Sequence, residues 1–225
     1  TFSDAFVPIE NLIGGVPGQG FKQASKVFGY TRLMVGAMGL GGGEAAMEIA
    51  INYAKERIQF KAPLSEKQGY THKLIIPNIV RLAAADAFIE ETATRLDSGE
   101  KDLEVEGSIA KLFATESANK AAEDAIQALG GYGYIAEYEV EKIKRDVRIT
   151  CIYEGTSEIQ QNIISMMRWK KTRKSKGGFY RAISEEMLRL DGEMDGAGCR
   201  IYGLAADALN QAIDLAHEQR LTKQQ

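Results

Sequence analysis

From Phe21 to Gln59 the apolar side chains recur every three or four residues, the spacing that places them on one face of an α-helix. The stretch at 45–50 is rich in alanine, which favours both helix formation and close helix packing. Five glycines, at positions 36, 39, 41, 42 and 43, weaken such a helix in isolation. We therefore predict a long helix whose glycines are in tight contact with a neighbouring helix.

A second amphipathic pattern runs from Gln68 to Leu96. Pro63 precedes it and ends the first helix, because proline cannot donate the hydrogen bond that continues a helix. Pro77 lies inside the pattern and predicts either a kink or a late helix start. The polar residues Ser98–Lys101 then predict a turn.

The next apolar stripe, from Ile109 to Leu129, ends at the pair Gly130-Gly131, a usual helix stop. A short helix is predicted over Glu137–Arg145, and a further stripe from Ile159 to Met167. Four helices joined by short links predict an all-α fold, an antiparallel four-helix bundle.

The two ends of the chain read differently from the bundle. Residues 1–20 carry proline and glycine turn signals and are interpreted as the frayed end of a β domain. The bundle is assigned to 21–168, and the cation-rich stretch 169–178, ending in two glycines, to a basic linker. Residues 179–225 show two more amphipathic patterns, broken near 195–198, and are interpreted as an incomplete helical extension.

The composition excludes several classes of function. Lys and Arg total 28 against 31 Asp and Glu, so the net charge of −3 gives no general attraction to nucleic acid or to an anionic membrane. Cys151, Cys199, His72 and His217 lack the spacing of a metal site, so no metal is expected and the thiols are expected to be reduced. No apolar run approaches the ~20 residues that span a bilayer, and Trp169 among lysines favours a solvated hinge over lipid docking.

The most informative residues lie in two runs. The first is QALGGYGY at 127–134, followed by Glu141 and Arg145-Asp146, and the second is IYEGTSEIQ at 152–160. Upstream of them stand VPIENLIG at 7–14, GFK at 20–22, Thr31-Arg32, ERIQF at 56–60, Pro63 and Gln68. In these motifs, over residues 7–168, the chain resembles the acyl-CoA dehydrogenase family.

The resemblance implies the C-terminal helical domain of an enzyme that uses FAD to oxidise an acyl-CoA to a trans-2-enoyl-CoA in fatty-acid β-oxidation. It implies a homodimer or homotetramer that shares FAD across its interface, an electron-transfer flavoprotein as acceptor, and a bacterial cytoplasm or mitochondrial matrix as location. The chain starts at Thr1 without Met, so we expect a piece of a longer protein that is inactive alone. The extension after 168 is weakly similar to that of very-long-chain members.

Glu154 is the candidate catalytic residue. From the residues alone, a carboxylate just before a helix could serve as a helix cap. The resemblance matches it with the family's catalytic base, which takes the proton on the carbon next to the thioester. A base buried beside an acyl chain and a flavin is desolvated, which raises its pKa toward that of the C–H it must deprotonate. The N–H of Glu154 is expected to bind the thioester oxygen.

The cofactor-binding candidates also come from the resemblance, each beside a structural alternative. Arg57 could lie on a solvated helix end, and Gln127, Gly130 and Gly131 could form a helix C-cap. Matched to the family, they bind the pyrophosphate and adenosine end of FAD. The full set of cofactor-binding candidates is Arg57, Gln59, Phe60, Gln68, Gln127, Gly130, Gly131, Thr156 and Glu158.

Arg32 and Gly155 are the candidate substrate-binding residues by the same resemblance. Arg32 could instead be buried against a carboxylate such as Glu44 or Asp146. The sequence also departs from the family: Gly29 replaces an acidic residue, Lys61-Ala62 replaces a glycine and a basic residue, and Gln161-Asn162 replaces an arginine-containing pair. Thr31 occupies the position where some members carry the base, which leaves Glu154 as the candidate.

Two other classes of function stay open from the sequence. One is a catalytically inactive helical module for oligomerisation or interaction, including a relative that binds DNA through the basic stretch. The other is an acyl-CoA oxidase or a flavin monooxygenase on the same fold. The intact run Tyr153–Thr156 and the acidic composition argue against the first class.

Overall fold

The structure is a computed structural model that describes residues 1–101, 103–194 and 198–218. The chain forms two compact units, Thr1–Ile164 and Ser165–Gln225. The predicted helix break near 195–198 lies mostly outside the described residues, as does the side chain of His217.

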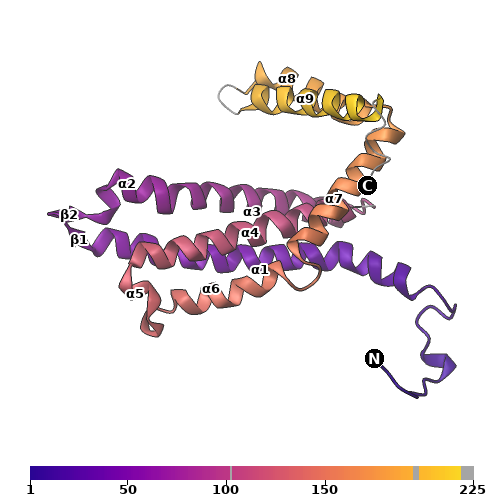
Figure 1. Ribbon diagram of the computed structural model, residues 1–225, viewed down its shortest axis with the longest axis horizontal. Helices are drawn as coiled ribbons and strands as arrows, with labels where there is room; N and C mark the ends of the chain where they lie inside the picture. The colour runs from indigo at the N-terminus through magenta and orange to yellow at the C-terminus, as the bar shows by residue number, and fades with distance from the viewer. Residues whose placement is uncertain (102, 195–197, 219–225) are drawn as a thin grey trace. The chain divides into compact units, whose positions relative to one another are not determined.

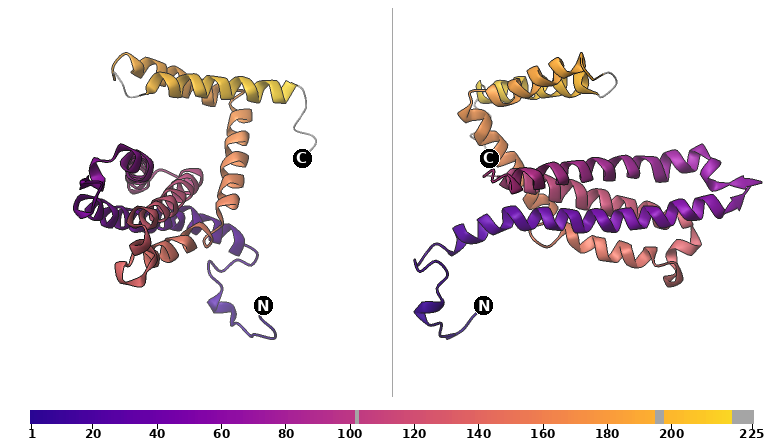
Figure 2. Two further views of the ribbon diagram at one scale, coloured as in Figure 1. Left: turned by 60° about the vertical axis from the view of Figure 1, so that its left-hand side comes forward. Right: turned by 180° about the vertical axis from the view of Figure 1, so that it is seen from behind.

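The first unit is built on helices, as the sequence predicts. Four of them pack together: α1 (Gly20–Glu56), α3 (Ile76–Asp97), α4 (Glu104–Leu129) and α6 (Val140–Arg148). In Figure 1 and Figure 2, α3 and α6 lie on opposite sides of the α1–α4 pair. The prediction of an all-α bundle is confirmed, and α1 and α4 form its centre.

Three glycines of α1 make the contact with α4. A Cβ atom added at Gly43 would lie 2.8 Å from the Cα of Ala118, closer than real Cβ contacts occur. Gly36 and Gly39 face Ala110 and Thr115 in the same way, so the contacts ascend along both helices and α1 runs parallel to α4. This agrees with the predicted antiparallel bundle, in which consecutive helices run in opposite directions, so that α1 and α4, separated along the chain by α3, run the same way.

The other two glycines of this run are placed differently. Gly42 faces Val147 of α6, whereas a Cβ atom at Gly41 would meet nothing within 4 Å. Small residues on both helices thus let α1 and α4 approach closely: glycine on α1 and alanine on α4. The buried alanines of α4 are Ala110, Ala114, Ala118, Ala121, Ala122, Ala125 and Ala128.

A short β-hairpin follows α1. Strands β1 (Ile58–Gln59) and β2 (Ala62–Pro63) pair antiparallel, and Phe60 and Lys61 form the two-residue turn between them. Both turn residues have positive φ, 51° and 64°, the condition of a type I′ turn. Glycine is favoured at such positions because it has no Cβ, so Lys61 keeps the turn at a cost.

We expect Lys61→Gly to raise the free energy of unfolding by about 0.5–1 kcal/mol, since left-handed backbone costs an L-residue ~1–2 kcal/mol and the greater freedom of glycine in the unfolded chain offsets part of the gain. Ala62→Gly is the matched control, because Ala62 is paired within β2 and should lose stability. Urea denaturation measures both. A Lys61→Gly protein less stable than wild type would contradict the turn assignment.

Between the hairpin and α3 the chain forms η2 (Leu64–Glu66), α2 (Gln68–Tyr70) and a π-helical turn, η3 (Thr71–Ile75). The helical path runs without a break from Gln68 into α3, so the alternative of a late helix start at Pro77 is wrong. Pro77 instead directly follows the π-helical turn that interrupts the α-helical pattern. The buried side chain of Asn78 then ties α3 to α4, because its Nδ2 donates to Asp124 Oδ2 at 2.8 Å.

Gly130 ends α4 with φ 61° and ψ −135°, a conformation that essentially only glycine adopts. The short elements α5 (Gly131–Tyr134) and η4 (Ala136–Tyr138) follow and lead back into α6. Here Tyr132 and Tyr138 pack with Tyr53 of α1, with ring centroids 5.0–6.5 Å apart. Figure 1 shows the hairpin and α5 at the same end of the bundle.

The fourth packed helix is α6, not the stripe at 159–167 that the sequence predicted. Val140 and Val147 of α6 are buried in the core. The later stripe belongs to α7 (Ser157–Lys174), where Ile159 and Met166 remain about half exposed. A short helix with two well-placed valines therefore fills the position that the longer apolar pattern was expected to fill.

Residues 1–19 contain the 3-10 turn η1 (Ile9–Asn11) and no strand. An extended segment needs a partner strand for its backbone hydrogen bonds, and the positive φ of Gly14, Gly15 and Gly18 turns the chain instead. Their assignment to the end of a β domain stays a prediction.

The second unit contains the end of α7 and two further helices, α8 (Gly178–Asp191) and α9 (Cys199–Glu218). Both predicted helices of the extension are therefore present. The predicted linker over 169–178 is wrong as far as Lys174, because α7 continues through it. Lysine and arginine are good helix formers, and cations are favourable in a last helical turn. Within the described residues, no helix is long and apolar enough to cross a membrane.

Candidate active site

The loop before α7 holds Glu154 in an unusual backbone conformation. η5 (Ile149–Cys151) ends just before it, and Glu154 and Gly155 both have positive φ, 57° and 94°. A Cβ atom at Gly155 would also lie 2.6 Å from Nε2 of Gln160, so position 155 requires glycine. A left-handed non-glycine residue is strained and persists only where its surroundings fix it. The surroundings of the loop therefore hold the backbone at Glu154 in a strained conformation, which fixes the direction of the Glu154 side chain.

The Glu154 carboxylate meets α1. Thr31 Oγ1 donates a hydrogen bond to Glu154 Oε2 at 2.8 Å, across 123 positions of sequence. The Glu154 side chain is half-buried, and within the described parts of the chain it forms no ion pair. Among the described residues, the carboxylate therefore has a hydroxyl donor and no neutralising partner.

Thr156, and not Glu154, caps α7. Its Oγ1 accepts a hydrogen bond from the N–H of Ile159 at 3.4 Å, the N-cap pattern at the start of a helix. A backbone N–H and then the Thr156 hydroxyl lower the pKa of Glu158 in the same helical turn. The alternative in which Glu154 serves as the helix cap is therefore overturned.

Two buried side chains hold the loop from its inner side. Gln160 Nε2 donates to the carbonyl oxygens of Glu154 and Gly155, at 3.1 and 3.0 Å. Lys111 Nζ, from α4, donates to the same Gly155 oxygen. Both side chains are completely shielded from solvent. Burial lowers the pKa of Lys111, because desolvation penalises its charged form.

The same face of α4 continues as a polar stripe that anchors the residues before the loop. Asn119 Nδ2 donates to the carbonyl oxygen of Val147 and to Cys151 Sγ, both at 3.0 Å. Ser157 Oγ bonds to Glu116 Oε1. Burial raises the pKa of the Cys151 thiol, which is therefore packed as an uncharged group.

Arg32, one residue after Thr31, is buried with 6% of its surface exposed. Its Nη1 donates to Ser108 Oγ at 3.2 Å and lies 3.7 Å from Glu104 Oε1. The structural alternative to substrate binding thus exists, but the carboxylate is Glu104, and the expectation of Glu44 or Asp146 was wrong. Those two residues project from other turns of α1 and α6. The Arg32 Nε has no hydrogen-bond partner among the described residues and remains a free donor.

A second group of candidates lies at the hairpin end of the bundle. Arg57 stacks over the ring of Tyr132, 6.0 Å from its centroid, which brings the hairpin beside α5. Phe60 is 90% exposed. The Gly130 and Gly131 backbone is open, since a Cβ atom at either would meet nothing within 4 Å. The other members of this group, Gln59, Gln68 and Gln127, are also exposed.

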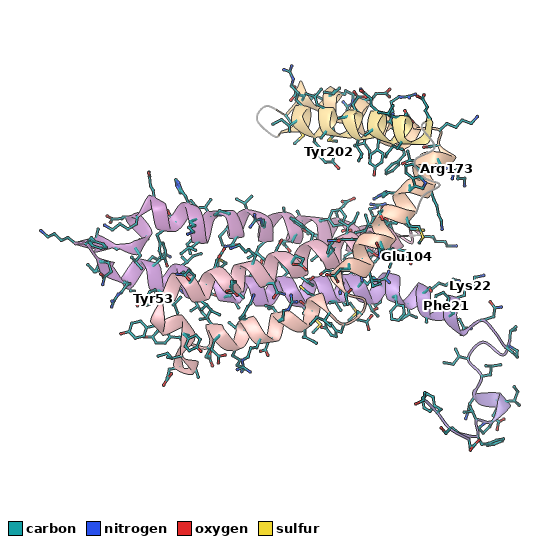
Figure 3. The ribbon with its side chains drawn as sticks, viewed as in Figure 1. Phe21, Lys22, Tyr53, Glu104, Arg173 and Tyr202 are labelled. Carbon is teal, nitrogen blue, oxygen red and sulfur yellow. The ribbon has the colours of Figure 1, made fainter. Side chains whose placement is uncertain are left out.

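One chain cannot bring the two groups together. Thr31 and Arg57 are separated along the continuous helix α1 by 26 residues, or about 39 Å at ~1.5 Å per residue. Figure 3 shows the same separation, with Tyr53 near the hairpin end and Glu104, the partner of Arg32, toward the other end. A single flavin cannot reach both groups of the same chain.

Residues 18–168 match the family model described as acyl-CoA dehydrogenase, C-terminal domain. The chain belongs to the acyl-CoA dehydrogenase family. Members of the family are FAD-dependent flavoproteins. The match covers the bundle, the Glu154 loop and both groups of candidate residues.

Similar proteins include an acyl-CoA dehydrogenase of Bacillus subtilis, 43% identical over 73% of this chain and 42% of its own length. The caffeyl-CoA reductase-Etf complex subunit CarC of Acetobacterium woodii is 40% identical over 75% of this chain and 44% of its own. The solved butyryl-CoA dehydrogenase of Megasphaera elsdenii aligns with a TM-score of 0.64 and 37% identity, covering 67% of this chain and 39% of that one. The chain thus spans about two fifths of the relatives it matches.

Two residues that support the Glu154 loop of this acyl-CoA dehydrogenase domain, Lys111 and Gln160, were not predicted from the sequence. Lys111 gave a signal: it follows Ala110 and precedes Ala114 and Thr115 on the small-residue face of α4, where a charged side chain must be buried. Gln160 stood inside the informative motif without a role. The cofactor and substrate roles of the other candidates stay predictions.

Proposed function

We propose that the chain is the C-terminal helical part of an FAD-dependent enzyme that removes hydrogen from Cα and Cβ of an acyl-CoA thioester, giving a trans-2-enoyl-CoA in fatty-acid β-oxidation. Glu154 is the base that takes the Cα proton. The observation that carries this proposal is the strained, doubly supported backbone at Glu154-Gly155, which holds an unpaired carboxylate against α1. Strain of this kind gathers at functional sites.

The residues of the loop divide the work. The Glu154 carboxylate accepts the proton, and Thr31 holds it by a single hydrogen bond that survives protonation by rotating its hydroxyl. The backbone N–H of Glu154 donates to no acceptor within the described residues, so it is available for the thioester oxygen, where negative charge develops. Gly155 lets the substrate approach the backbone, and Arg32, one residue after Thr31 on α1, is the other proposed substrate-binding residue.

FAD, when bound, supplies the acceptor for the hydride that leaves Cβ. The residues present fit such a group at two places. Thr156 and Glu158 lie at the start of α7, beside the base. The open glycine backbone at 130–131 and the exposed guanidinium of Arg57 fit the pyrophosphate and adenosine end, since a guanidinium binds phosphate oxygens bidentately.

Because these places are ~39 Å apart in one chain, the second belongs to the FAD site of another copy. We therefore propose a homodimer or homotetramer in which each copy supplies the hairpin end to its neighbour's flavin. The strong exposure of Phe60 and of Tyr134, which is 83% exposed, supports a covering partner at this end.

The electron acceptor and the direction of the reaction come from relatives. The name of the Acetobacterium woodii relative includes both a reductase and an Etf complex. An electron-transfer flavoprotein is accordingly the proposed redox partner. Reduction of an enoyl-CoA is a second candidate function, because it uses the same two carbon atoms and the same base with the proton moving the other way.

The test uses the full-length protein that contains this chain, with FAD bound and oxygen excluded. Acyl-CoA thioesters of graded length should bleach the flavin absorbance, whereas the free acids, which lack the thioester, should not. An enoyl-CoA that reoxidises the photoreduced enzyme without net bleaching by any acyl-CoA would favour the reductase. Flavin unresponsive to both thioesters would contradict the proposal.

A further inference from the structure

The loop that carries Glu154 rests on a buried ammonium group. Lys111 projects from the middle of the α4 face that packs against α1 and the loop, and none of its surface is exposed. Its Nζ donates to the carbonyl oxygen of Gly155. A lysine is almost never fully buried without a reason, because its charge is costly to remove from water. Methionine would fill the same space at no such cost.

Groups of both charges act on Lys111. Burial lowers its pKa most and Arg32 of α1 lowers it further, whereas Cys151, Glu154 and Glu116 raise it. The two carboxylates accept hydrogen bonds from hydroxyl groups, Glu116 from Ser157 and Glu154 from Thr31. The contact of Lys111 with the loop is therefore its bond to the Gly155 carbonyl.

The bond from Lys111 holds the carbonyl group of Gly155, the residue after the base. Gln160 of α7 donates to the same oxygen, so this carbonyl accepts one hydrogen bond from α4 and one from α7. Gly155 and Glu154 both have left-handed backbone, which an unanchored loop would leave. A donor at this oxygen therefore controls where the Glu154 N–H and carboxylate point.

We infer that Lys111 is a positioning residue of the active site, which anchors the Gly155 carbonyl from beneath. The inference rests on the proposed function for its catalytic consequence, but the anchoring of the loop does not depend on it. Lys111 touches no substrate and acts only through the loop.

The decisive variant is Lys111→Met, which keeps the length of the side chain and removes the charge and the donor. In the full-length holoprotein we expect amide hydrogen exchange at 154–157 to become about tenfold faster or more, the factor for a lost charge-assisted bond. kcat/KM should fall by roughly tenfold to a hundredfold, because small misplacement of reacting groups is costly.

A conservative variant separates positioning from mere packing. Lys111→Gln keeps a neutral donor, so it should restore slow exchange at 154–157 and kcat in part, whereas Lys111→Met should restore neither. The loss in Lys111→Met should fall on kcat with KM little changed, because Lys111 touches no substrate.

Lys120→Met is the matched control, because Lys120 lies on the same helix with its side chain 52% exposed and pairs with Asp124. It should leave loop exchange and kcat unchanged. Unchanged exchange in Lys111→Met, or exchange and kcat no better in Lys111→Gln than in Lys111→Met, overturns the inference. Should Lys111→Met fail to fold, Lys111→Gln is compared with the wild type, and wild-type exchange together with wild-type kcat overturns the inference. Glu154→Gln, run in parallel, reports on the proposed function separately: activity retained there sinks the base assignment and leaves the loop measurement intact.

Discussion

Glu154→Gln, placed in the full-length FAD-loaded protein, is expected to lower the rate of flavin reduction by an acyl-CoA by about 10²–10⁴-fold, the range that general bases contribute. Glutamine keeps the shape of the side chain and can still accept the hydrogen bond from Thr31, whose hydroxyl lies 2.8 Å from Glu154 Oε2. It cannot accept the Cα proton at neutral pH. The loss should therefore fall on kcat, with binding of the thioester little changed.

Rapid-mixing absorbance of the flavin measures this rate directly. Glu90→Gln is the matched control, because Glu90 is exposed on α3 and has no part in the proposed site. It should retain the rate within a few-fold. A Glu154→Gln protein that loses only a few-fold would show that another group takes the proton.

Gly43→Val is expected to destabilise the bundle by about 3 kcal/mol, at the upper end of overpacking effects. The Cβ would lie 2.8 Å from Ala118 Cα and 2.9 Å from Leu82 Cδ2, and the first of these is backbone that cannot move aside. The two further methyl groups of valine would force α1 and α4 apart. Because the α1–α4 contact lies at the centre of the fold, no surface adjustment can relieve the clash.

Gly41→Ala, on the same helix, is expected to change the free energy of unfolding in the opposite direction. Nothing lies within 4 Å of a Cβ there, so the substitution should add ~0.5–1 kcal/mol through helix propensity alone. Chemical denaturation followed by circular dichroism compares both variants. If both changed stability alike, glycine flexibility and not the close approach of α1 and α4 would explain this run.

The sequence predicted a close helix neighbour for the glycines of α1, because repeated glycine weakens an amphipathic helix unless a neighbouring helix packs closely against it. It could not reveal which glycines meet which helix, since Gly41, Gly42 and Gly43 differ only by rotation about the axis. Pro77 predicted a disturbance of the second helix, and the π-helical turn lies directly before it. Both predictions rest on the backbone properties of glycine and proline, which can be read from the residues themselves.

Other features depend on contacts that sequence does not display. The fourth packed helix proved to be α6 and not α7. Which of the two is buried depends on where the chain turns back after α4, and the length of the apolar stripe in the sequence does not reveal this. The expected linker is helical through Lys174, since a run of cations is compatible with both a helix end and a loop. For the site, Glu154 was singled out by resemblance, whereas its supports Thr31, Lys111 and Gln160 became apparent only when α1, α4 and the loop met.

The uninterrupted course of α1 makes it a rigid spacer between the proton-accepting loop and the residues proposed to grip a neighbour's cofactor. Adding one residue between Arg32 and Tyr53 would rotate the hairpin by about 100° and advance it by ~1.5 Å relative to Thr31. The side chains that now face α4 would then turn away from it. The number of residues in α1 therefore sets both the distance and the relative orientation of the Glu154 loop and the hairpin end.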